Sequence, residues 1–228
     1  MRQQVTEIPG MNPISTKTRR TRIKFCGITR AEDAAAAIAL GVDALGFVLV
    51  PKSARFMAPA AAAIIRAALP PLVSVVALFS NADENFVREA VALLKPDLLQ
   101  FHGEEDAEFC ESFGVPYMKA VAMTAQTSLV QQVTLYPAAA ALLLDSHAPG
   151  GMGGSGRSFD WKQVQAVGKP IVLAGGLRPD NVGEGIRSLR PYAVDVSSGI
   201  ELQPGIKSRE KMQAFVAAVR AADQELNS

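Results

Sequence analysis

The chain has 228 residues, of which 49% are hydrophobic and 20% charged, so it can bury one full core and has an ordinary globular composition. A formal net charge of +1 gives no electrostatic reason to expect nucleic acid or an acidic membrane as a partner. Two cysteines are too few for a disulfide framework or a zinc site, and no apolar run is long enough to span a membrane. We therefore expect a cytoplasmic protein without a metal.

The N-terminal segment, residues 1–20, is predicted to be a disordered extension. It lacks the apolar stretch of a secretory signal, but it carries Thr and Arg with a single acid, Glu7. An organellar transit peptide is the alternative. Residues 21–228 are expected to form one catalytic domain.

From residue 21 onward, short apolar runs alternate with Ala- and Leu-rich helical patterns. Eight runs are typical of parallel strands buried on both faces: 23–26, 44–50, 73–79, 97–101, 117–121, 141–145, 170–174 and 192–196. Helices are predicted over 31–40, 60–69, 84–94, 125–133, 179–189 and 208–222, the last with Ser208 as its N-cap. Eight strand–helix repeats favour an α/β fold of the single (β/α)8 TIM barrel type over an open sheet, which usually stops at five or six strands.

In such a barrel, binding and catalysis belong to the carboxyl ends of the strands. Three Gly- and Ser-rich clusters follow the predicted strands six, seven and eight, at residues 150–156, 175–176 and 197–199. Main-chain amides in such loops bind phosphate, and we expect the phosphate contacts at Gly154, Gly156, Gly175, Gly176, Ser197, Ser198 and Gly199. For any single cluster, a tight turn is the alternative explanation.

Two residues are candidates for acid–base chemistry. Cys26 ends the first predicted strand, where its thiol would face the mouth of the barrel. An inert buried cysteine is the alternative. Asp145 ends an apolar strand, and a carboxyl group there has to be paired, neutral or functional. A structural cap for the next loop is its alternative.

Three further polar residues lie near predicted strand ends. Arg55 could clamp a carboxylate or phosphate through two hydrogen bonds, or could be a solvated surface residue. His102 could line the pocket or be structural. Asp195 is placed one residue further inward than Asp145, and we interpret it either as a support for the loop after strand eight or as a group that lies behind the catalytic residues.

Six ordered motifs together resemble the phosphoribosylanthranilate isomerase family. They are 24–29 (KFCGIT), 53–56 (SARF), 99–103 (LQFHG), 153–156 (GGSG) with 159–161 (FDW), 173–177 (LAGGL) and 194–201 (VDVSSGIE). They span nearly everything from residue 22 to the C-terminal helix. Departures from the family are small: Ser155 stands where Thr is frequent, Ala54 where Pro is common, and Ser208 at an often acidic position.

The resemblance implies an isomerase of tryptophan biosynthesis that converts N-(5-phosphoribosyl)anthranilate to 1-(2-carboxyphenylamino)-1-deoxyribulose 5-phosphate. It implies that Asp145 is the general acid, that Cys26 is the base, that Arg55 holds the anthranilate carboxylate, and that no cofactor is needed. The partner is then a small phosphorylated substrate, and the chain is a monomer or a homodimer. Two alternatives are the related histidine-pathway isomerase, whose substrate carries two phosphates, and a catalytically silent barrel that binds a sugar phosphate.

Overall fold

Eight parallel strands pair in chain order and close into a barrel, in a computed structural model that describes residues 20–124, 126–146, 161, 164 and 167–228. The strands are β1 (Arg22–Cys26), β2 (Ala44–Val48), β3 (Ser74–Phe79), β4 (Leu98–Phe101), β5 (Tyr117–Ala122), β6 (Ala141–Asp145), β7 (Ile171–Leu173) and β8 (Ala193–Val196). The predicted TIM barrel is confirmed.

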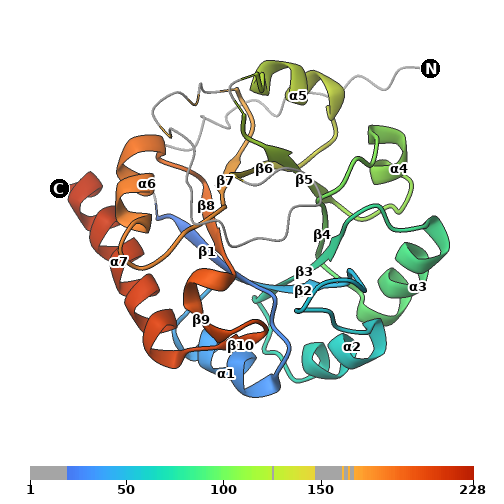
Figure 1. Cartoon of the computed structure of the whole chain (residues 1–228), viewed down its shortest axis with the longest axis horizontal. Coiled ribbons are helices and arrows are strands. Elements are labelled where there is room, and N and C mark those ends of the chain that lie inside the picture. The colour runs from blue at the N-terminus through green and yellow to red at the C-terminus, as the bar shows by residue number, and fades with distance from the viewer. Residues whose placement is uncertain (1–19, 125, 147–160, 162–163, 165–166) are drawn as a thin grey trace, which may run out of the picture.

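Helices surround this ring of strands (Figure 1). They are α1 (Ala31–Ala39), α2 (Pro59–Ala67), α3 (Glu84–Leu94), α4 (Ala107–Glu111), α5 (Leu129–Leu135), α6 (Val182–Leu189) and α7 (Arg209–Asn227). The Ser208 side chain accepts a hydrogen bond from the Lys211 amide, so the predicted N-cap of the last helix is confirmed. Asp83 caps α3 in the same way.

Alternation along each strand points its apolar residues toward two faces. One face packs against the helices in a large cluster that includes Phe25, Phe47, Phe79 and Phe101. The other face fills the barrel, where Ala141 and Ala174 lie among larger side chains such as Met118 and Leu143. Small residues inside the barrel leave room for polar groups near its mouth.

Besides shifts of a few residues at several element ends, such as α7, which continues to Asn227, the structure departs from the predicted elements in three places. The helix predicted over 125–133 begins later, at Leu129, because Ser128 caps it. The five-residue α4 was not predicted, since it is too short to display a helical period. A hairpin of β9 (Glu201–Gln203) and β10 (Ile206–Lys207) was also not predicted; its strands are short, and Gly205 turns between them at φ +82°.

The hairpin is hydrogen-bonded to α1 and to the loop that precedes α1. The Lys207 amide donates to the Asp33 carboxylate on α1 at 3.1 Å, and Thr29 donates to the Gly205 carbonyl. The hairpin therefore lies against the loop that leaves β1. Within the described part of the chain, no helix has the length and apolar character needed to cross a membrane. Residues 1–19 lie outside the described ranges, so the predicted extension stays a prediction.

Candidate active site

A cavity of about 400 Å³ opens at the carboxyl ends of the strands. The predicted site residues that line it are Cys26, Arg55, Asp145, Gly175, Gly176, Ser197 and Ser198. Gly199 is not part of its wall, and Gly154 and Gly156 lie outside the described residues. The base and acid candidates thus line one cavity, although three strand steps separate β1 from β6 around the ring.

The Cys26 thiol faces the interior of the barrel and is only 5% exposed. Its neighbour on β2 is Gly46, where an added Cβ would lie 2.9 Å from the Cys26 sulfur and 3.1 Å from the Lys24 nitrogen. Burial raises the pKa of Cys26 above its ordinary value, and the nearby charges of Lys24 and Lys207 partly oppose that rise. The site therefore holds a thiol whose ionisation depends on its cationic neighbours.

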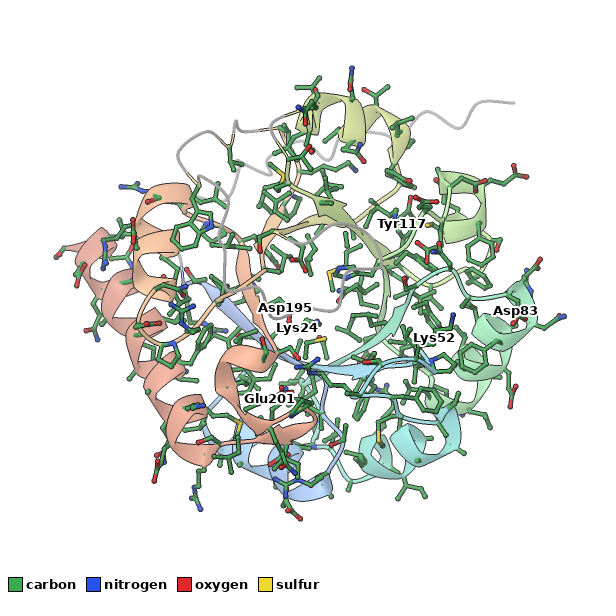
Figure 2. The ribbon with its side chains drawn as sticks, viewed as in Figure 1. Lys24, Lys52, Asp83, Tyr117, Asp195 and Glu201 are labelled. Atoms are coloured by element: carbon green, nitrogen blue, oxygen red, sulfur yellow. The ribbon has the colours of Figure 1, made fainter. Side chains whose placement is uncertain are left out.

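Lys24 and Asp195 form an ion pair beneath Cys26. They are direct partners on the paired strands β1 and β8, and the Lys24 nitrogen lies 2.8 Å from one Asp195 oxygen. Figure 2 shows the two side chains together in the middle of the ring. Burial lowers the pKa of Lys24, but the attraction and hydrogen bonding of Asp195 and Cys26 have the larger effect. The pKa of Lys24 is therefore raised above its ordinary value. Asp195 therefore pairs with an ammonium group beside the thiol, which fits the interpretation as a group behind the catalytic residues better than the loop support.

Asp145 ends β6 with its side chain 15% exposed. One of its oxygens lies 3.4 Å from Nε2 of His102. The other ring nitrogen of His102, Nδ1, lies 3.2 Å from the side-chain nitrogen Nε2 of Gln100. A Cβ added at Gly175 would lie 2.7 Å from the other Asp145 oxygen. His102 therefore contacts the carboxyl group, Gln100 positions the His102 ring, and Gly175 leaves space for the carboxyl group.

Arg55 reaches the cavity from the loop between β2 and α2, but one edge of its guanidinium is already engaged. Nε and Nη2 donate to the two Glu201 oxygens at 2.9 and 2.7 Å. Gly27 gives the side chain room to pass, since a Cβ there would lie 2.6 Å from Arg55 Cδ. The hydrogen bonds that Arg55 donates to Glu201 raise the pKa of Arg55, so the guanidinium remains charged.

The described glycines of the predicted phosphate loops have different structural roles. Gly175 and Gly176 have φ values of +76° and +65°, which favour glycine, so the tight-turn explanation holds for their conformation. They also line the cavity. At Gly199 an added Cβ would collide with the Leu177 carbonyl, so this glycine permits packing between two loops.

Three buried polar atoms of the cavity residues make no hydrogen bond within the described part of the chain. They are Gln100 Oε1, Asp195 Oδ1 and Ser197 Oγ. A buried polar atom without a partner is costly, and native proteins rarely retain one without a functional reason. All three atoms can accept hydrogen bonds, so the arrangement suits a ligand that brings hydroxyl groups.

Several residues that the structure places here have no role in the sequence-based prediction. Glu201 and Gln100 belong to motifs of the family resemblance but carry no expected role, and Lys207 and Gly46 lie outside those motifs. Lys24 is different, because its even spacing from Cys26 along β1 predicts that both side chains face the interior and that Lys24 can supply positive charge there. Lys207 offered no local signal. Among the described residues, no three His, Cys, Asp or Glu side chains converge as ligands for a metal would.

Known proteins match both the sequence and the fold. The family model of N-(5'-phosphoribosyl)anthranilate isomerase matches residues 23–218. The N-(5'-phosphoribosyl)anthranilate isomerase of Stenotrophomonas maltophilia strain R551-3 is 53% identical over 208 residues, which cover 90% of this chain and 95% of that protein.

Solved structures agree with this match. Phosphoribosyl anthranilate isomerase of Thermus thermophilus has a TM-score of 0.79 at 41% identity, covering 88% of this chain and 99% of its own. The Thermotoga maritima enzyme has a TM-score of 0.81 at 34% identity, with the same coverage of 88% and 99%. The chain therefore belongs to the phosphoribosylanthranilate isomerase family.

Proposed function

We propose that this chain catalyses the Amadori rearrangement of N-(5-phosphoribosyl)anthranilate to 1-(2-carboxyphenylamino)-1-deoxyribulose 5-phosphate, a step of tryptophan biosynthesis. The observation that carries the proposal is the shared cavity, whose wall includes Cys26, Asp145 and Arg55 beside the loops after β7 and β8. A solved relative with a TM-score of 0.76 and 32% identity, covering 88% of this chain and 99% of its own, is described as a complex with reduced 1-(o-carboxyphenylamino)-1-deoxyribulose 5-phosphate. A ligand of that chemistry matches the groups around the cavity.

The reaction starts at Asp145. Its carboxyl group protonates the ring oxygen of the ribose, the bond from C1 to that oxygen breaks, and the nitrogen lone pair forms an iminium bond to C1. His102, which Gln100 positions, holds the carboxyl group in place. Asp145 leaves this step as a carboxylate.

Cys26 performs the second step. Its thiolate removes the proton from C2, the electrons of that bond form a C1–C2 double bond, and the iminium electrons return to nitrogen. The enolamine then becomes the ketone when its C2 hydroxyl loses a proton and C1 gains one. Exchange with water returns the Cys26 proton to solvent and a proton to Asp145. The substrate nitrogen accepts the electrons, so these steps require neither a metal nor an organic cofactor.

The remaining groups bind the two ends and the middle of the substrate. Arg55 would hold the ring carboxylate, and main-chain amides at Gly175, Gly176 and Ser198 would hold the phosphate, with Gly154 and Gly156 proposed for the same role. The unpartnered oxygens of the cavity suit the sugar hydroxyls that lie between these ends.

The proposal includes a location in the cytoplasm and a monomeric or homodimeric state. Both cysteines are free thiols, which agrees with a reducing compartment such as the cytoplasm. A Thermotoga maritima relative, with a TM-score of 0.75 at 32% identity, is described as monomers made from a dimeric enzyme. For this chain, monomer or homodimer remains the prediction.

The test is turnover by the purified chain, followed as the loss of anthranilate fluorescence. Cys26→Ala and Asp145→Asn should each reduce kcat by about 10²- to 10⁴-fold, the usual contribution of a general acid or base. Cys110→Ala is the matched control, because Cys110 is buried outside the cavity and should tolerate the change. Full activity in either site variant would refute the assignment. The two-phosphate substrate of the histidine-pathway isomerase serves as the contrast, and preference for it would refute the proposed substrate.

A further inference from the structure

Glu201 connects two cations at the rim of the cavity. It is the first residue of β9, and its side chain is 4% exposed. One side of the carboxylate accepts the two hydrogen bonds from Arg55, and Oε1 also lies 2.8 Å from the Lys207 nitrogen. Burial works against its ionisation, but Arg55 and Lys207 outweigh that effect and hold the pKa of Glu201 below its ordinary value. Glu201 is therefore a fixed carboxylate between two positive groups.

Lys207 anchors this carboxylate to the framework of the barrel. Its side chain is fully buried, and its nitrogen donates to the main-chain carbonyls of Cys26 at 2.6 Å and Ser197 at 3.2 Å. Those carbonyls belong to the end of β1 and the loop after β8. One ammonium group thus fixes the position of Glu201 relative to the catalytic thiol and the proposed phosphate loop.

The guanidinium of Arg55 has a second edge. It carries five N–H groups, of which Glu201 takes one on Nε and one on Nη2. Nη1 makes no hydrogen bond with any described residue, so the pair of donors on Nη1 and Nη2 is intact. A pair of that geometry matches a second carboxylate. Arg55 lines the cavity, so a bound molecule can reach it.

The local charge supports the same conclusion. Arg55 and Lys207 contribute two positive charges and Glu201 one negative charge, which leaves an excess of +1. Lys207 is buried, and Arg55 is 17% exposed at its side chain, so solvent screens this excess only in part. A ligand carboxylate would neutralise it. A neutral aryl group would leave it uncompensated.

We propose that Glu201, anchored by Lys207, is a positioning residue that holds Arg55 by one edge and thereby presents the other edge to the ring carboxylate of the substrate. Glu201 then sets the preference of the cavity for an aryl group that bears a carboxylate. A long arginine side chain held in this way loses less conformational freedom when the ligand binds. The inference rests on the proposed function, in which Arg55 holds that carboxylate.

The test measures how much the ligand carboxylate contributes to binding, apart from the rest of the ligand. The two probes are reduced 1-(o-carboxyphenylamino)-1-deoxyribulose 5-phosphate and the same molecule without its carboxyl group. Kd for each is measured by titration calorimetry on the full chain. In the unmodified protein, loss of the carboxyl group should weaken binding by about 10- to 100-fold, the range for hydrogen bonds to a charged group.

Glu201→Gln should reduce this Kd ratio to below about 5, while Kd for the probe without a carboxyl group changes by less than about 3-fold. A role that is merely structural would weaken both probes equally and leave the ratio unchanged. Glu201→Asp keeps the charge but is one methylene shorter, so it cannot meet Arg55 and Lys207 together. Glu201→Asp should therefore also lower the ratio of the two Kd values. It can be used to test the inference if Glu201→Gln does not fold.

Glu84→Gln is the matched control, because Glu84 pairs with Arg88 on the exposed surface of α3 and should keep the full ratio. A full ratio in the Glu201 variants would overturn the inference, and so would an equal loss for both probes. Failure of the proposed function gives a different result, since the unmodified chain would then lack turnover and would not distinguish the two probes.

Discussion

The Lys24 ammonium lies 2.8 Å from the Asp195 carboxylate inside the barrel, and both side chains are at least nine-tenths buried. Cys26 is two residues further along the same strand and faces the same interior. The ammonium group therefore stands beside a thiol that has to give up its proton during the proposed reaction. Burial raises the pKa of Cys26, and Lys24 is the strongest opposing influence.

Lys24→Met should impair both catalysis and folding. Without the ammonium group the pKa of Cys26 rises further, so less thiolate is present and kcat/KM at pH 7 should fall at least about tenfold. The unpaired Asp195 should lower the free energy of unfolding by about 3 to 5 kcal/mol. Urea unfolding and steady-state kinetics measure the two effects. Lys24→Met with Asp195→Leu should recover much of the stability without the activity, and recovery of both would contradict the role of the ammonium group.

Alkylation should distinguish the two cysteines. The pKa of Cys26 is raised by burial, so the rate of its modification by iodoacetamide should rise about tenfold per pH unit between pH 7 and 9. Burial raises the pKa of Cys110 to about 12, and its side chain has no exposure, so it should stay unmodified in the native protein. Peptide mass spectrometry identifies the labelled residue. A rate for Cys26 that does not change with pH would show that its thiol is already ionised.

Gly46→Ala should disturb the thiol without removing any polar group. The added Cβ would press on the Cys26 sulfur from 2.9 Å and on the Lys24 nitrogen from 3.1 Å. Overpacking of this kind costs about 1 to 3 kcal/mol of stability, and we expect kcat to fall by about tenfold or more because a misplaced base is inefficient. Gly183→Ala in α6 is the control, since the nearest atom there is 3.3 Å away on the flexible Arg187 side chain. Equal kinetics for the two variants would argue against tight packing at Cys26.

Acid should weaken the fold partly through Glu201. Its pKa is lowered in the folded state, so its ion pairs stabilise the protein above the unfolded value near 4.5, and that stabilisation is lost as the pH falls below it. The free energy of unfolding should therefore decrease less between pH 6 and 3.5 in Glu201→Gln than in the unmodified protein. Urea titrations at several pH values measure this. Parallel pH dependences would mean that Glu201 is not a paired carboxylate.

Most of the barrel followed from local patterns. Eight apolar runs, the cap at Ser208 and the polar residues at strand ends can each be read within a few neighbouring residues, because strand burial and helix capping depend on local periodicity. Cys26 and Asp145 were identifiable in the same way, since strand parity and strand ends place both side chains at the mouth. The hairpin at 201–207 escaped prediction because strands of three and two residues carry too little periodicity.

The sequence by itself determined the fold class, the family motifs and the two acid–base candidates. Only the tertiary structure decided which charges meet: Arg55 pairs with Glu201 across 146 residues, and Lys24 with Asp195 across 171. Such pairs depend on barrel closure, which sets the register of β1 against β8. Closure also places Gly46, which has no side chain, beside the Cys26 thiol. Closure is a long-range event, and no local pattern encodes which buried cation will face which carboxylate.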